Sequence, residues 1–308
     1  MAAPIPIRAW HWAGFILGVI LLIALDLGVF HRGSRPVRMG QALGWSAVWF
    51  SLALLFAGAL ARWRSPEESL QFLTGYLIEF SLSLDNVFAM AVIFGSFGVA
   101  PELRHGVLFW GVAGALLMRG LMIGVGAALL ASFHWLLYLL GAFLVIAGVR
   151  WGIRKQPFAR PQDNPVIRLA RRLLPVSAGF DGARFVTVAG GRRMLTPLAL
   201  VLLAVETADL IFALDSIPAV LAVTQKAFIV FTSNIFAILG LRSLYFVLSG
   251  AMEYFRYLRA GLAVVLVLIG LKMLAAPWYS APASLSLAVV LAIVAVAMTA
   301  SLLAARRR

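Results

Sequence analysis

The hydrophobic positions of this chain fall into long continuous runs, and few short stretches alternate between polar and apolar residues. A helix needs roughly 20 apolar residues to cross a bilayer, whereas the strands of a membrane barrel alternate over roughly ten. The runs therefore predict about nine transmembrane helices, at 10–30, 41–61, 69–97, 106–130, 133–150, 197–222, 228–248, 258–275 and 283–304. The fold class we expect is an all-α polytopic membrane protein.

One long polar insert, residues 151–196, interrupts these runs and is rich in Arg, Pro and Gly. Within it, the segment 182–193 has the pattern of a small hairpin around Gly190-Gly191. We divide the chain into two N-terminal helices, a first three-helix unit, the basic insert, a second three-helix unit and a C-terminal helix, at 1–68, 69–150, 151–196, 197–276 and 277–308.

The two three-helix units share a sequence motif. In each unit an acidic residue is followed six positions later by Asp and then by a small polar residue, as Glu79, Asp85 and Asn86 and as Asp209, Asp215 and Ser216. Downstream, Arg119 and Arg242 lie in the second helix of each unit, and Leu144–Arg150 resembles Leu266–Lys272. Because three is an odd number of crossings, the two copies must enter the membrane from opposite sides. Such inverted repeats are typical of secondary transporters, which bind substrate between the repeats.

Composition supports a membrane location and excludes several other classes. The 308 residues are 63% hydrophobic and 12% charged, with a mean hydropathy of +0.98, which is too apolar for a soluble protein. The chain has no cysteine, so disulfides, thiolate metal sites and cysteine nucleophiles are excluded. No paired nucleophile and base and no soluble catalytic domain are visible, so we do not expect an enzyme or a tightly bound cofactor.

The net charge of +14 would suggest nucleic acid in a soluble protein, but here the bases lie in loops between apolar runs. With the N-terminus outside, the inside segments hold 19 Lys and Arg residues and the outside segments four. Positive charge is enriched in cytoplasmic loops. We therefore expect a bacterial inner-membrane protein with its C-terminus and its insert in the cytoplasm, and no nucleic-acid partner.

Charged residues inside the predicted spans carry the candidate chemistry. There are six acids, Asp26, Glu79, Asp85, Glu206, Asp209 and Asp215, and three bases, Arg119, Arg242 and Lys272. A charge near the bilayer centre costs about 2.5–3.5 kcal/mol on insertion scales. Since three bases neutralise at most three acids, the remaining acids must be protonated, bind a cation or face water. The structural alternative is that Arg119 and Arg242 pair with acids only to lock helices together.

Helix geometry divides these acids further. Glu206 and Asp209 share a helix face, whereas Asp209 and Asp215 are about 240° apart on an unbroken helix. Pro218 predicts a break that would expose the carbonyl of Leu214 as a ligand. Asn86 and Ser216 would add neutral oxygens. The hydroxyls of Ser81, Ser83 and Thr207 are expected to bond to their own helix backbone.

Oxygen ligands without thiolate suit Mg²⁺, Ca²⁺ or Mn²⁺. A carboxylate cluster in a medium of low dielectric can also exchange protons for a cation, which is the minimal requirement for antiport.

At these residues the chain resembles the TerC family of tellurium-resistance membrane proteins, including its Alx-type manganese exporters. The resemblance rests on Glu79–Asn86, on Glu206–Ala219 with both aspartates and Pro218, on Asn234–Phe246 with Arg242, and on Asp26 between two leucines. It covers about residues 10–275. It implies a nine-helix protein of the LysE-like transporter group and a link to manganese export, metal-ion homeostasis and tellurite resistance.

Together these features predict a proton-coupled exporter of a divalent cation, with Mn²⁺ as the first candidate. The predicted ligands are Asp85, Asp209, Asp215, Glu79, Glu206, Asn86 and Ser216. Arg119, Arg242, Asp26 and Lys272 would serve as counter-ions or in proton coupling. Two alternatives remain. One is a membrane-assembly or envelope-stress factor without transport, acting through 151–196. The other is direct handling of a tellurium oxyanion, against which the excess of acids argues.

Overall fold

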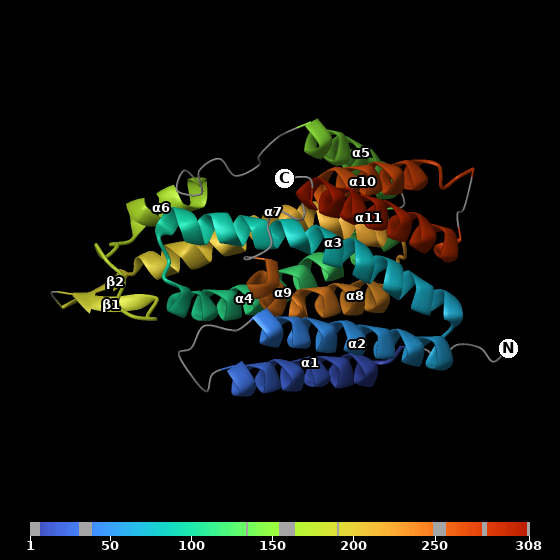
Figure 1. The fold of residues 1–308 in the computed structure, drawn as a ribbon. Helices are drawn as coiled ribbons and strands as arrows, with labels where there is room; N and C mark the ends of the chain where they lie inside the picture. The colour runs from blue at the N-terminus through green and yellow to red at the C-terminus, as the bar shows by residue number, and fades with distance from the viewer. Residues whose placement is uncertain are drawn as a thin grey trace.

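A computed structural model describes residues 7–30, 39–133, 135–153, 164–189, 191–248, 257–278 and 282–306 of the chain. These residues form helices and one small hairpin (Figure 1). The elements are α1 (Ala9–Phe30), α2 (Met39–Trp63), α3 (Pro66–Phe97), α4 (Pro101–Ser132), α5 (Leu136–Ile153), α6 (Pro165–Leu173), β1 (Val186–Ala189), β2 (Arg192–Leu195), α7 (Pro197–Leu221), α8 (Ala227–Leu239), α9 (Leu241–Leu248), α10 (Leu258–Leu274) and α11 (Ala283–Arg306).

The predicted membrane helices are all present among the described residues. Among the described residues, seven helical stretches are long and apolar enough to cross a membrane, with α8 and α9 taken as one stretch. α1 and α10 lie where the two other membrane helices were expected. The expected helix 228–248 is divided at Gly240 into α8 and α9. The expectation of an all-α polytopic membrane protein is therefore confirmed.

The predicted break at Pro218 is wrong. α7 continues from Pro197 to Leu221 with Pro218 inside it. Pro218 lies in the last turn, so it removes one hydrogen bond near the helix end, and the residues around it, from Ser216 to Leu221, are all buried by packing. Asp209 and Asp215 therefore lie on different faces of one continuous helix.

Local sequence signals explain where the central helix α3 begins and ends. The Ser65 hydroxyl accepts a hydrogen bond from the Glu68 amide at 3.1 Å, and Pro66 occupies the first turn, where its missing N–H is tolerated. Gly98 ends the helix with a φ of 63°, a left-handed conformation that glycine adopts without strain. These two signals fix the depth at which α3 presents its polar residues.

The insert carries a short helix and the predicted hairpin. α6 packs on α7 through the buried Ile167, and β1 pairs with β2 in antiparallel register, with Ala189 opposite Arg192. The hairpin around Gly190-Gly191 is thus confirmed, although Gly190 itself lies outside the described residues. Beside it, a hydrogen bond from the Thr187 hydroxyl lowers the pKa of the Asp181 carboxyl.

The helices are arranged in layers around a buried centre. In Figure 1, α1 and α2 lie on one side of α3 and α7, and α5, α10 and α11 lie on the other. Burial within the spans is 67% for α3 and 88% for the α8–α9 stretch, but 17–22% for α2, α4, α5 and α11. These outer helices therefore leave most of their apolar surface for lipid, and the buried polar residues lie on α3, α7 and α8 and on the inward face of α4.

Corresponding helices of the two units pack on each other and run in opposite directions. α3 contacts α7, α4 contacts α8 and α5 contacts α10. Following the chain in Figure 1, α3 and α5 run from right to left, whereas their counterparts α7 and α10 run from left to right. This is the arrangement that an inverted repeat requires.

Two close contacts between α5 and α10 follow the same symmetry. A Cβ at Gly270 would lie 2.7 Å from the carbonyl oxygen of Gly141, and a Cβ at Gly148 would lie 2.7 Å from that of Ala263. Aligning Leu144 with Leu266 places Gly141 with Ala263 and Gly148 with Gly270, so the repeat maps one contact onto the other. Small residues allow such close helix packing in membranes.

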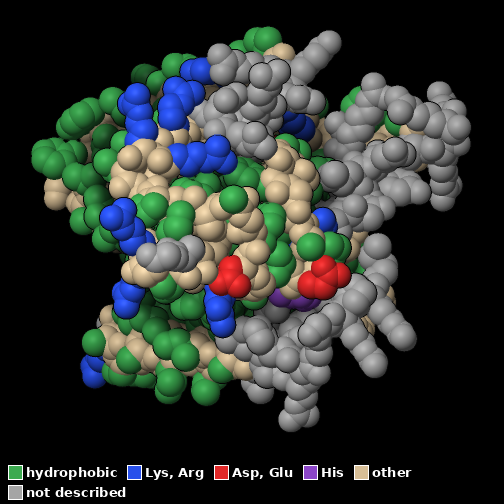
Figure 2. Space-filling view, turned by 90° about the vertical axis from the view of Figure 1, so that its left-hand side faces the viewer, with side chains coloured by type: hydrophobic (Ala, Val, Ile, Leu, Met, Phe, Trp, Pro, Cys, Tyr) green, Lys and Arg blue, Asp and Glu red, His purple; other side chains and the backbone are tan. Residues whose placement is uncertain are grey.

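Basic side chains gather at the insert end of the bundle, and three exposed tryptophans lie at the other end. Figure 2 views the end where the insert lies and shows Lys and Arg side chains gathered there. Six exposed bases belong to the insert, namely Arg168, Arg171, Arg172, Arg184, Arg192 and Arg193. The exposed Trp10, Trp135 and Trp278 lie at helix ends on the opposite side, where a belt of interfacial aromatic residues is expected.

Candidate functional site

The centre of the molecule holds a buried arginine between two carboxylates. Arg119, in the middle of α4, is 1% exposed. Its Nε and Nη2 donate to the two carboxylate oxygens of Asp209 on α7, at 3.2 and 2.8 Å, and its Nη1 donates to Oε1 of Glu79 on α3. The structure thus pairs Arg119 with Glu79 and Asp209, as the structural alternative anticipated for an arginine, although not with Asp85 or Asp215.

Neutral side chains complete this cluster. Arg119 Nη1 also lies 3.3 Å from the Ser216 hydroxyl and 3.4 Å from Oδ1 of Asn234 on α8. The Asn86 amide donates to Asp209 at 3.1 Å. Four helices, α3, α4, α7 and α8, therefore meet at one set of polar side chains, which we call the Arg119 cluster: Glu79, Asn86, Arg119, Asp209, Ser216 and Asn234.

The Arg119 cluster is built from equivalent positions of the two repeats. Glu79 and Asp209 are the first acids of the two motifs, and Asn86 and Ser216 are the polar residues that end them. Glu79, Asp209 and Ser216 contact the Arg119 guanidinium directly. Asn86 reaches it through its hydrogen bond to Asp209. The site therefore lies where the two inverted repeats meet, as the repeat predicts.

The Arg119 cluster has unsatisfied hydrogen-bonding capacity. Glu79 Oε2 and Asn86 Oδ1 in the cluster, and Ser83 Oγ one turn from Glu79 on α3, are buried oxygens without a hydrogen-bond partner among the described residues. Residues 79, 83 and 86 have the spacing of one helix stripe, so α3 turns these oxygens to the same face. With both carboxylates ionised, two acids and one base leave the cluster one negative charge. A buried polar group without a partner is unfavourable, so this face can accept a proton or a cation.

Glu206 lies beside the cluster on the same face of α7 as Asp209. Its carboxylate packs against Gly114 of α4, where any Cβ would overlap it. Because α4 also carries Arg119, the prediction that Glu206 and Asp209 share a face is confirmed. Glu206 forms no ion pair with any described residue.

Asp85 and Asp215 lie outside the Arg119 cluster. Asp85, six residues beyond Glu79 on α3, has Arg259 as a charged neighbour. Asp215 has Arg150 and Trp151 of α5 as its neighbours. Both carboxylates are partly exposed, and neither forms an ion pair within 4 Å in the part of the chain that the structure describes.

The predicted ligands are thus distributed over several places. Among the described residues, no three His, Asp or Glu side chains lie close enough together to hold a metal ion. Lys272 is separate from the cluster, since its ammonium donates to the Ser286 hydroxyl at 2.8 Å. Asp26 and Arg242 belong to α1 and α9, but their side chains lie outside the described part of the chain.

Sequence reasoning missed two polar residues of this region. Asn234 is fully buried and binds Arg119, and its signal was an amide inside a long apolar run. Ser83 was expected to bond to its own backbone, as Thr207 does to Leu203 at 2.6 Å, but its hydroxyl has no partner among the described residues. Its spacing from Glu79 and Asn86 was the available signal.

Comparison with known proteins identifies the family. The model of the integral membrane protein TerC family matches residues 64–308, which include every described residue of the Arg119 cluster. The chain belongs to the TerC family. It is 51% identical over 296 residues to the uncharacterized membrane protein STKORF319 of Myxococcus xanthus, covering 96% of this chain and 92% of that one.

Other relatives in the TerC family are similar over most of their length. A protein of Escherichia coli K12, provisionally named membrane-bound redox modulator Alx, is 44% identical over 291 residues, covering 92% of this chain and 91% of the relative. An uncharacterized membrane protein of Rickettsia bellii is 34% identical over 292 residues, covering 95% and 97%. No solved structure matches this TerC protein.

Proposed function

We propose that this TerC protein exports a divalent cation, with Mn²⁺ as the first candidate, across a bacterial inner membrane in exchange for protons. The observation that carries the proposal is the sharing of one buried guanidinium by Glu79 and Asp209, which occupy equivalent positions in two inverted repeats. In transporters of this architecture, substrate binds at the repeat interface.

In this proposal the Arg119 guanidinium occupies the cation site between Glu79 and Asp209 when no metal ion is bound. The guanidinium neutralises one of the two carboxylates and leaves one charge for a proton. A divalent cation bound by Glu79 and Asp209 would supply two positive charges at the same place, and Arg119 would be repelled from it. Cation and guanidinium therefore compete for the same oxygens, and this competition couples occupancy to the position of α4.

The unpartnered oxygens supply the further ligands. Glu79 Oε2, Ser83 Oγ and Asn86 Oδ1 are buried and carry no hydrogen bond from described residues. Hydroxyl, amide and carboxylate oxygens are hard ligands, which favours Mn²⁺, Mg²⁺ or Ca²⁺ over softer metals. Ser216 and Asn234, released from Arg119, would join them.

In this proposal, the acids outside the Arg119 cluster bind the cation or a proton on its way to and from the cluster. Glu206, Asp85 and Asp215 lie on the same two helices, α3 and α7, and form no ion pair with described residues. Intramembrane carboxylates of this kind mark ion pathways and proton relays in transporters. We assign them to entry, exit and proton exchange, and we keep Asp209 and Glu79 as the central ligands.

The printed name of the E. coli relative refers to redox modulation. A thiol–disulfide relay is not available to this chain, because it has no cysteine. An effect on redox state through the level of a transported metal would be compatible with both the name and the site. A link to tellurite resistance would likewise be an indirect consequence of the level of the transported metal.

The test is flux in proteoliposomes that contain the purified protein, with an imposed pH gradient and a panel of Mn²⁺, Mg²⁺, Ca²⁺ and Zn²⁺. We expect Mn²⁺ flux that dissipates the gradient and that is lost in Glu79→Gln and in Asp209→Asn. Glu67→Gln is the matched control, since Glu67 lies exposed at the start of the same helix α3. Wild-type protein that moves none of these ions would refute transport and favour an assembly role of 151–196.

A further inference from the structure

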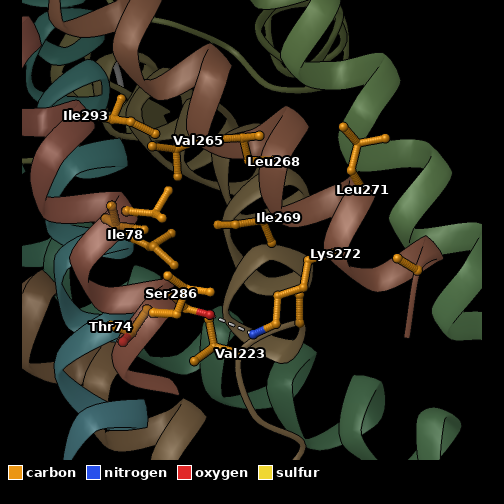
Figure 3. Close-up of a pocket in the computed structure, with 15 residues that line it drawn as sticks. Thr74, Ile78, Val223, Val265, Leu268, Ile269, Leu271, Lys272, Ser286 and Ile293 are labelled. Carbon is orange, nitrogen blue, oxygen red and sulfur yellow. Dashed lines mark hydrogen bonds between the residues drawn. The ribbon is translucent and has the colours of Figure 1, made fainter. Parts of the chain in front are cut away.

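A largely aliphatic cavity with one basic side chain lies apart from the Arg119 cluster. The cavity, of about 430 Å³, opens between α3, α10 and α11, beside the end of α7 (Figure 3). Its size falls within the range of small-molecule sites. Its walls are almost entirely aliphatic, with Ile78, Val265, Leu268, Ile269 and Ile293 among the lining residues. None of the described residues that line it is acidic.

One cation stands at one end of this cavity. Lys272, in the last turn of α10, donates a hydrogen bond to the Ser286 hydroxyl of α11 at 2.8 Å, and the described residues give it no carboxylate partner. Figure 3 shows Lys272, Ser286 and Thr74 together at one end, with Ile293, Val265 and Leu268 at the other. The cavity is therefore amphiphilic along its length.

The charged end lies toward the membrane surface. The exposed Trp278 follows Lys272 by six residues, just beyond the end of α10, and Ser286 lies in the first turn of α11. Exposed tryptophan side chains mark the level of the lipid headgroups. The aliphatic end, at Val265 and Ile293, lies deeper along both helices.

We propose that this cavity binds an anionic membrane phospholipid, with the phosphate of its headgroup on Lys272 and Ser286 and one acyl chain along the aliphatic wall. The occupant follows from charge and shape. An ammonium without a counter-ion attracts an anion, and a long aliphatic cavity beside α11, most of whose span is exposed, suits a chain that enters from the bilayer. A metal cation is disfavoured, because the described lining residues include one base, Lys272, and no acid.

Native mass spectrometry of the purified protein tests this proposal. Phosphatidylglycerol and phosphatidylcholine with the same acyl chains are titrated against wild type, Lys272→Gln, Lys272→Arg and Arg62→Gln. Arg62 is the matched control, an exposed base at the same end of the bundle on α2. We expect wild type, Lys272→Arg and Arg62→Gln to prefer the anionic lipid about fivefold, the effect of one surface base, and Lys272→Gln to lose that preference.

A further variant tests the acyl chain. Leu268→Trp, at a half-exposed position of the aliphatic end, should weaken binding of both lipids while leaving the thermal stability of the protein near that of wild type. An unchanged preference for phosphatidylglycerol in Lys272→Gln would overturn the headgroup assignment. Full displacement of the lipid by millimolar inorganic phosphate would show a site for a free anion and would overturn the lipid proposal. Neither result bears on cation flux, so the transport proposal is tested separately.

Discussion

Glu79 and Asp209 occupy the same position in the two repeats, and both bind the guanidinium of Arg119. Each carboxylate is buried, with exposed fractions of 0% and 3%. Neither acid would be tolerated as an isolated charge at this depth, because removing a carboxylate from water without a partner is strongly unfavourable. The arginine therefore makes the pair possible, and the two repeats depend on each other at this point.

Replacing Arg119 should destabilise the protein. Arg119→Gln leaves two buried carboxylates facing each other without a cation, which we expect to cost about 3–5 kcal/mol of folding free energy. The melting temperature in detergent and the yield of folded protein should both fall. Arg62→Gln, an exposed base on α2, should leave both unchanged. The triple change Arg119→Gln, Glu79→Gln and Asp209→Asn should recover stability but not flux. A wild-type melting temperature for the single variant would contradict the pairing.

Asp85 and Asp215 should behave in the opposite way. Neither is a partner of Arg119, so Asp85→Asn and Asp215→Asn remove a membrane charge without leaving that guanidinium unpaired. We expect folded proteins with melting temperatures near or above wild type and with Mn²⁺ flux reduced at least tenfold, since an amide loses the charge that attracts a cation. Lost stability that is rescued by a second change at the neighbouring base, Arg259→Gln for Asp85→Asn or Arg150→Gln for Asp215→Asn, would show instead that these aspartates are structural partners.

The sequence was sufficient for the elements and their symmetry, because both depend on local patterns. Apolar runs located the predicted membrane helices, Gly190-Gly191 located the hairpin, and the duplicated motif predicted that α3 and α7 run in opposite directions. The charged residues inside the predicted spans also include three members of the Arg119 cluster, Glu79, Arg119 and Asp209.

Which acid pairs with Arg119 could not be predicted in this way. Glu79 and Asp85 lie six positions apart in one motif, and only the rotation of α3 against α4 decides which of them meets the arginine. The helix break at Pro218 was wrong for a related reason, since tertiary packing of α7 outweighs one lost hydrogen bond. Asn234 comes from α8, whose approach to α4 no local pattern encodes.

The symmetric glycine contacts between α5 and α10 should be intolerant of even one methyl group. Gly270→Ala and Gly148→Ala each place a Cβ 2.7 Å from a backbone carbonyl oxygen of the facing helix, which cannot move without separating the helices. We expect each to lower stability by about 1–3 kcal/mol, as overpacking does. Gly152→Ala is the matched control on α5, because its Cβ would meet Ala263 at an ordinary 3.8 Å. Equal melting temperatures for all three variants would argue against this close packing.

The orientation of the chain in the membrane can be tested by labelling single introduced cysteines. The chain has no cysteine of its own, so any labelling comes from the introduced residue. We choose Arg184→Cys in the insert, where the side chain is 75% exposed, and Glu67→Cys at the exposed start of α3. The bases gathered at the insert end predict that the insert is cytoplasmic, since cytoplasmic loops carry the excess of Lys and Arg. A membrane-impermeant maleimide added to intact cells stripped of their outer membrane should label Cys at position 67 and should reach position 184 only after lysis.

Labelling of both before lysis would place the two positions on one side and contradict the odd number of helices between them. Labelling of position 184 alone would reverse the orientation and, with it, the proposed direction of cation export.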